Sequence, residues 1–183
     1  MRSGSKIQQM TYIALMAVII AICSWITIPG PVPFTLQTFA VFTTLLLLGA
    51  RDSLLSILIY LLLGAVGVPV FSGFSGGIGH LLGPTGGYLI GFLVMGLVYA
   101  VIEHFTKASV IRNVLASAVG MLFCYAFGTM WFVIVYSRNT PISFGAALSM
   151  CVLPFIIPDA VKMALAILLS ERVRKLVPTL KKQ

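Results

Sequence analysis

The chain has 183 residues, of which 60% are hydrophobic and 9% are charged, and its mean hydropathy is +1.09. Because a soluble domain usually carries about a quarter charged residues, this composition excludes an ordinary water-soluble domain and predicts an all-α, multi-pass membrane protein. The net charge of +8 comes from basic residues that flank apolar segments, which argues against a nucleic-acid-binding face.

Six transmembrane helices are predicted from the apolar runs and the residues that interrupt them. Their expected ranges are 10–28, 35–49, 53–66, 88–102, 114–136 and 158–175. The first run follows two basic residues as a signal peptide would, but it is long for one and is expected to remain as a helix. Residues 67–87 form a glycine-rich loop, and prolines interrupt the segment 137–157. Residues 1–183 are therefore expected to form a single transmembrane domain.

The distribution of Lys and Arg predicts the orientation of these helices. Ten of the twelve cations fall on one side of the predicted membrane, Arg138 falls on the other, and Lys162 lies inside the last span. Since basic residues are enriched in cytoplasmic loops, both termini are expected to be cytoplasmic. The glycine-rich loop and the segments 29–34 and 137–157 then face outward.

Asp159 and Lys162 stand three residues apart in the last apolar run. An ionisable residue in a membrane span costs about 2.5–3.5 kcal/mol on insertion scales, so this pair marks a candidate functional site. If the helix begins at Pro158, the negative charge of Asp159 is stabilised by the positive end of the helix dipole, whereas the positive charge of Lys162 is repelled by it. A helix-start acid with its salt-bridge partner explains Asp159. An anionic ligand group that enters from outside would also explain Lys162.

Two further outward elements offer groups for a small-molecule site. The segment PVPFTLQTF places Thr35, Gln37 and Thr38 at the start of the second helix, where an amide suits a urea-like group, although Thr35 could simply cap the helix. The glycine-rich loop could present its backbone to a compact polar ligand or pack between helices. His80 in this loop could contact the ligand or hydrogen-bond to the backbone.

Enzymatic, metal-binding and phosphate-binding alternatives lack the residues they need. The two histidines fall on opposite sides of the predicted membrane, the three cysteines have no metal-ligand spacing, and no Walker-type motif is present. We therefore expect no catalytic residues, no metal and no cofactor. On the first helix, Ala14, Ala17 and Ala21 form a small-residue face that could receive another helix or pack internally.

Four segments read in order carry a resemblance to a known family: PVPFTLQTFAVF, YLLLGAVGVPVFSG, GGIGHLLGPTGGYLIGF and PFIIPDAVKMALA. The chain resembles the BioY family, the biotin-specific substrate-binding subunits (S components) of energy-coupling factor (ECF) transporters, over nearly its whole length. The resemblance implies an S-component-type fold that binds biotin at its outer face. The positions that it assigns to biotin are Thr35, Gln37, Gly76, Gly77, His80, Tyr88, Asp159 and Lys162.

The resemblance also suggests roles and partners. Lys162 would meet the valerate carboxylate of biotin, and Asp159 would accept from a ureido N–H or hold Lys162 in place. Pro158 departs from the glycine that many members have before this aspartate. The alanine face would dock on a membrane scaffold protein that couples to two cytoplasmic ATPases, in a bacterial or archaeal plasma membrane. The alternatives are an S component for another vitamin and a structural membrane protein without a ligand.

Overall fold

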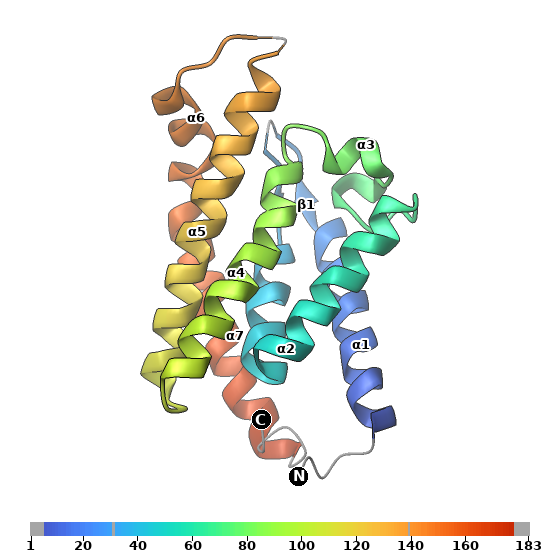
Figure 1. The fold of residues 1–183 in the computed structure, drawn as a ribbon, viewed down its shortest axis with the longest axis vertical. Coiled ribbons are helices and arrows are strands. Elements are labelled where there is room, and N and C mark those ends of the chain that lie inside the picture. Colours follow the sequence, from blue (N-terminus) through green and yellow to red (C-terminus); the bar gives the residue numbers. More distant parts are fainter. Residues whose placement is uncertain (1–5, 31, 139, 178–183) are drawn as a thin grey trace.

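The computed structural model describes residues 6–30, 32–138 and 140–177 (Figure 1). Its elements in chain order are α1 (Lys6–Trp25), β1 (Thr27–Ile28), β2 (Phe34–Thr35), α2 (Gln37–Ala65), the 3-10 helix η1 (Ser72–Phe74), α3 (Ile78–Leu81), α4 (Gly86–Phe105), α5 (Val110–Tyr136), α6 (Phe144–Cys151) and α7 (Leu153–Leu176). The two short strands pair antiparallel as a hairpin between α1 and α2.

The predicted second and third helices are the two halves of α2. They meet at Gly49, whose φ of 72° and ψ of 175° lie outside the helical region and suit a residue without a side chain. Among the described residues, five segments are long and apolar enough to cross a membrane: the helices α1, α2, α4 and α5, and the stretch from Phe144 to Leu176. With α2 counted as two halves, the six predicted helices are confirmed.

The helices form a bundle around α2, which packs against α1, α4 and α7, while α4 lies along α5 (Figure 1). Small residues allow this close approach. A Cβ atom at Gly91 of α4 would lie 2.8 Å from the Cys124 sulfur of α5, and one at Gly128 would lie 2.2 Å from the Tyr88 ring. The glycines therefore fix how deeply Cys124 and Tyr88 sit between α4 and α5.

The start of α7 corrects the prediction that the last helix begins at Pro158. The helix begins at Leu153, with Pro154 in its first turn and Pro158 inside it. Proline at the first turn removes an N–H that has no helical partner, whereas Pro158 only leaves the carbonyl of Pro154 without its helical donor. Asp159 consequently lies in the second turn of α7, so the helix dipole does not account for it.

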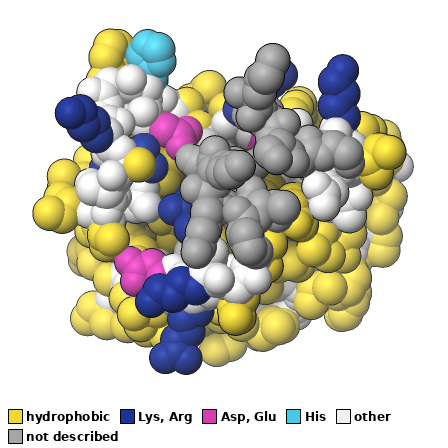
Figure 2. Space-filling view, turned by 90° about the horizontal axis from the view of Figure 1, so that it is seen from below, with side chains coloured by type: hydrophobic (Ala, Val, Ile, Leu, Met, Phe, Trp, Pro, Cys, Tyr) yellow, Lys and Arg dark blue, Asp and Glu magenta, His cyan; other side chains and the backbone are white. Residues whose placement is uncertain are grey.

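The molecule has two chemically different ends. Both ends of the described chain lie at the lower end in Figure 1, where α1 begins and α7 finishes, and Figure 2 shows Lys and Arg side chains gathered on this face. We call it the basic end. The hairpin, α3 and α6 lie at the opposite end. The glycine-rich loop there contains η1 and α3, two short helical turns that were not expected from its composition.

Candidate ligand-binding site

A cavity that holds about 630 Å³ of open space lies at the end opposite the basic end. Part of this space is open to the outside, so a ligand could enter from this end. The helices α2, α4, α5, α6 and α7, the hairpin and the glycine-rich loop all contribute to it. The lining residues are Val32, Pro33, Thr35, Gln37, Thr38, Ser72, His80, Thr85, Tyr88, Leu89, Phe92, Met121, Cys124, Tyr125, Cys151, Phe155, Asp159 and Lys162.

The Lys162 ammonium lies on the wall of this cavity with every donor engaged. Its Nζ donates to Asp159 Oδ1 at 2.9 Å, to the Thr35 carbonyl at 2.7 Å and to Thr38 Oγ1 at 3.1 Å. It also lies 4.0 Å from the centre of the Phe34 ring, which adds a cation–π contact. Since an ammonium has three N–H groups, Lys162 is saturated by the protein itself.

The Asp159 carboxylate is held just as firmly. Besides Lys162, its Oδ1 accepts from the Thr38 hydroxyl at 2.8 Å, and its Oδ2 accepts from the Tyr125 hydroxyl at 2.6 Å. Only 4% of Asp159 and 6% of Lys162 is exposed. A buried ion pair of this kind is tolerated only when further hydrogen bonds compensate for the lost water, and these contacts supply them. The pair carries no net charge.

Gln37 and Thr35 are polar residues of the cavity lining. The Gln37 side chain is buried, and its Nε2 donates to the Tyr60 hydroxyl at 2.7 Å. The Thr35 hydroxyl accepts from the Gln37 N–H at 3.2 Å, while the Thr35 carbonyl binds Lys162. The N-cap residue of α2 is Leu36, so Thr35 does not cap the helix as the alternative suggested; it lies one residue earlier, contacts the first helical N–H and belongs to the cavity.

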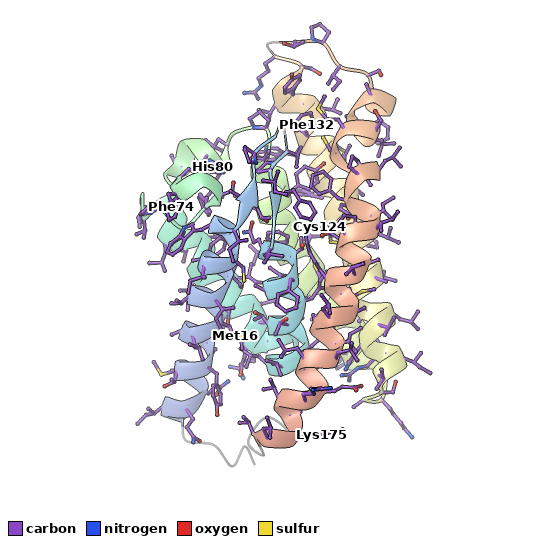
Figure 3. The ribbon with its side chains drawn as sticks, turned by 180° about the vertical axis from the view of Figure 1, so that it is seen from behind. Met16, Phe74, His80, Cys124, Phe132 and Lys175 are labelled. Carbon is purple, nitrogen blue, oxygen red and sulfur yellow. The ribbon has the colours of Figure 1, made fainter. Side chains whose placement is uncertain are left out.

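His80 and Tyr88 line the cavity from the glycine-rich loop and the start of α4. His80 Nδ1 lies 3.1 Å from Ser75 Oγ and its ring stacks on Phe71 at 5.2 Å, so its partner in the loop is a side chain. Burial lowers the pKa of His80 below its ordinary value. The Tyr88 hydroxyl pairs with Thr129 Oγ1 at 2.9 Å. Figure 3 shows His80 on the loop side and Cys124 among the helices.

Two of the predicted ligand contacts lie outside the cavity lining. A Cβ atom at Gly76 would lie 2.5 Å from the Val68 carbonyl oxygen. Gly77 has φ of 93° and donates its N–H to the Gly64 carbonyl at 2.7 Å. Both glycines thus shape the loop that holds His80. Sequence reasoning missed Tyr125. The available signal was its hydroxyl within the apolar stretch 121–127 of α5.

On α1, the three alanines divide between the interior and the surface. Ala17 and Ala21 are buried in the main core, where α1 meets α2, whereas Ala14 is exposed. Internal packing therefore accounts for Ala17 and Ala21, whereas Ala14 lies on the outer face of the helix. A scaffold interface on this helix stays a prediction.

The BioY family profile matches residues 1–179. The chain belongs to the BioY family. This family member is 41% identical over 174 residues to a probable biotin transporter BioY of Pyrococcus horikoshii, an alignment that covers 92% of this chain and 98% of the relative. It is 36% identical over 170 residues to the biotin transporter BioY of Thermotoga maritima, with 92% and 97% covered.

A solved structure supports the same assignment. The crystal structure of the S-component for biotin from an ECF-type ABC transporter superposes on this BioY-family chain with a TM-score of 0.80 and 29% identity, and covers 96% of this chain and 95% of the other. The predicted S-component-type fold is therefore confirmed, and the chain is a multi-pass membrane protein of a transporter family.

Proposed function

We propose that this chain captures biotin in the cavity and serves as the substrate-binding subunit of an ECF transporter. The observation that carries the proposal is a neutral Asp159–Lys162 pair, with every Lys162 donor engaged, on the wall of an otherwise largely apolar cavity. Relatives that align over almost the whole chain are named as biotin transporters, and the similar solved structure is named as a biotin S-component.

The charges of the site favour the ureido ring of biotin at the Asp159–Lys162 pair. Lys162 has no free donor, and the pair is already neutral, so a carboxylate placed there would leave one uncompensated negative charge away from water. A ureido group is neutral. One of its N–H groups can donate to the remaining lone pair of Asp159, on Oδ2, and its carbonyl can accept from the amide of Gln37.

The valerate carboxylate then belongs near Ser72, His80 and Thr85, which are half-buried polar residues from the glycine-rich loop side of the cavity. A carboxylate keeps part of its hydration there, which lowers the cost of burying its charge. This arrangement differs from the interpretation based on sequence, in which the carboxylate meets Lys162. The reason is the number of bonds that Lys162 makes within the protein.

The energy for transport would come from other subunits. No nucleotide-binding motif is present in the sequence, so we infer that a membrane scaffold protein and two cytoplasmic ATPases complete the transporter in a bacterial or archaeal plasma membrane. Binding of biotin to the isolated chain requires none of these partners, because the described chain alone lines the cavity.

Calorimetry on the purified chain tests the proposal. We expect tight binding of biotin and no heat with thiamin or riboflavin. Binding of either other vitamin in place of biotin would assign a different substrate, and no binding at all would favour a structural role.

A matched pair of lysine variants tests where each part of biotin lies. Lys162→Met is expected to weaken biotin and a neutral biotin amide to the same extent, because both carry the ureido ring. Lys175→Met, at an exposed lysine of the basic end, is expected to change neither affinity. A loss confined to biotin would place the carboxylate at Lys162 instead.

A further inference from the structure

The cavity has a wall that is rich in sulfur. Two of the three cysteines in the chain, Cys124 and Cys151, line it together with Met121. All three side chains are buried, Cys124 and Cys151 to within 1% of full burial. The remaining cysteine, Cys23 on α1, lies outside the cavity lining.

Tyr88 contacts the sulfur-lined wall. Cys124 donates its S–H to the Tyr88 carbonyl, with 3.7 Å between sulfur and oxygen. Tyr88 also packs against the apolar cluster that contains Cys151, and its hydroxyl pairs with Thr129. Because the Cys124 thiol proton is committed to a backbone carbonyl, Cys124 offers its polarisable sulfur atom to a ligand, and Cys151 and Met121 add two further sulfur atoms to the same lining.

The sulfur-lined wall adjoins the charged pair. Cys124 precedes Tyr125, whose hydroxyl donates to Asp159, and all three residues line the cavity. In biotin the ring that contains the thioether sulfur is fused to the ureido ring. A ureido ring bound at Asp159 therefore brings the thioether within reach of this wall.

We infer that Cys124, Cys151 and Met121 select the thioether ring of biotin and make this BioY-family site prefer biotin over analogues that lack the sulfur. The inference rests on the proposed function. Its physical basis is dispersion, since sulfur is large and soft and contacts another sulfur or an aromatic ring favourably, while a ring oxygen is smaller and less polarisable. These residues would determine specificity, whereas Asp159 and Gln37 would supply the polar anchoring.

The affinity ratio between biotin and oxybiotin, in which oxygen replaces the ring sulfur, tests the inference. We expect Cys124→Ser and Cys151→Ser each to lower the preference for biotin by roughly three- to tenfold, the size of a lost sulfur contact. Cys23→Ser is the matched control and should keep the wild-type ratio. Because both ligands are measured on the same preparation, a partly inactive variant does not distort the ratio.

Met121→Leu provides a milder version of the same test. Leucine conserves the volume and replaces the sulfur with carbon, so folding is not at issue and the biotin preference should fall in the same direction. An unchanged ratio in all three wall variants, with biotin still bound tightly, would overturn the inference alone. Failure of the wild-type chain to bind biotin would instead overturn the proposed function.

Discussion

Each end of the molecule holds a carboxylate–cation pair, and the two pairs are built differently. At the cavity end, Asp159 and Lys162 are separated by 2.9 Å, with side chains that are 5% and 7% exposed. At the basic end, Glu103 and Arg112 are 3.9 Å apart, and 27% of the Glu103 side chain is exposed. The first pair lines the cavity described above, and the second is not part of that lining.

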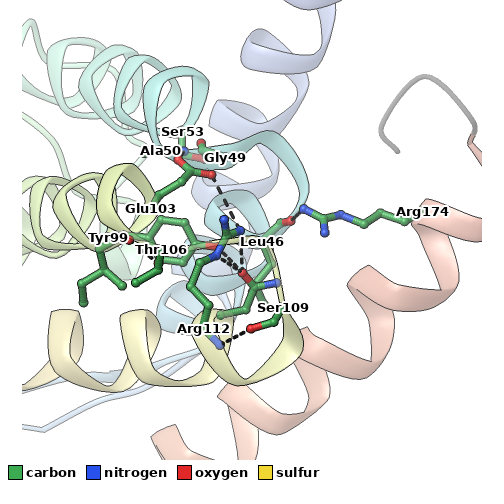
Figure 4. A network of polar contacts seen from close by, with 12 residues as sticks. Leu46, Gly49, Ala50, Ser53, Tyr99, Glu103, Thr106, Ser109, Arg112 and Arg174 are labelled. Atoms are coloured by element: carbon green, nitrogen blue, oxygen red, sulfur yellow. Dashed lines mark hydrogen bonds and ion pairs between the residues drawn. The ribbon is translucent and has the colours of Figure 1, made fainter. Parts of the chain in front are cut away.

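The Glu103–Arg112 pair at the basic end connects α4 with α2 and α5 (Figure 4). Glu103 Oε2 accepts from the N–H of Ala50 at 2.8 Å, directly after the break at Gly49, so it supports the start of the second half of α2. Arg112 donates to Asn113, which also accepts from Tyr99. Nearby, Arg174 of α7 donates to the Leu46 carbonyl.

The comparison shows that ionisable residues in a membrane bundle do not by themselves mark a binding site. Both ends bring a carboxylate and a cation together, and both satisfy them with hydrogen bonds from neighbouring helices. The Asp159–Lys162 pair lies beside the open space of the cavity and has one lone pair left on the carboxylate. We therefore expect substitutions at the cavity end to change affinity and substitutions at the basic end to change stability.

The largest expected effect follows from Asp159→Asn. Removing the carboxylate leaves the buried Lys162 ammonium without its counterion, a change that typically costs about 3–5 kcal/mol, so we expect biotin affinity to fall by at least about 100-fold. Glu103→Gln is the matched change at the basic end and should leave biotin affinity unaltered. Titration calorimetry measures both, and equal losses in the two variants would remove the distinction between the ends.

A smaller loss of affinity is expected from Gly128→Ala. The added Cβ would lie 2.2 Å from the Tyr88 ring, so Tyr88 must shift away from the cavity wall that it supports. We expect biotin to bind about tenfold more weakly, in line with the 1–3 kcal/mol cost of overpacking, part of which appears in binding. Gly145→Ala in α6 is the control, because a Cβ there meets nothing within 4 Å. Similar affinities for the two variants would show that Tyr88 does not depend on this contact.

The sequence predicted the helices and the charged pair because both leave local signals. Long apolar runs, proline and the cost of burying charge are visible along the chain, and they indicated six helices and the Asp159–Lys162 pair. The partners of the pair were not visible. Tyr125 lies 34 residues from Asp159, and only the packing of α5 on α7 brings their side chains together.

Pro158 shows the limit of a local signal. A proline after an apolar stretch is typical of a helix start, but Pro154 occupies the first turn and the helix continues through Pro158. The glycine loop is a similar case. Composition indicates its irregular backbone, yet which residues face the cavity depends on contacts such as Gly77 with Gly64, so His80 lines the cavity and Gly77 does not.

Gly49→Ala is expected to lower stability without weakening biotin binding. Its φ of 72° disfavours any side chain, and the new Cβ would lie 3.2 Å from Glu103 Oε1. We expect a loss of about 1–3 kcal/mol, which thermal unfolding in detergent would detect as a lower midpoint. Gly79→Ala, where a Cβ meets nothing within 4 Å, provides the control. A fall in the biotin affinity of the folded Gly49→Ala protein would show that the break in α2 communicates with the cavity.

The smallest expected effect is a pH dependence that separates the two histidines, His80 near the cavity and the exposed His104 at the end of α4. Burial holds the pKa of folded His80 below its ordinary value near 6.5. The unfolded chain therefore takes up a proton at this residue before the folded chain does. His80 thus favours unfolding increasingly as the pH falls below about 6.5, and its contribution is absent well above that pH. Without biotin, His80→Gln should flatten the acid side of the plot of unfolding midpoint against pH, whereas His104→Gln should not reproduce this change. Superimposable curves for wild type and His80→Gln would mean that the loop does not shield His80.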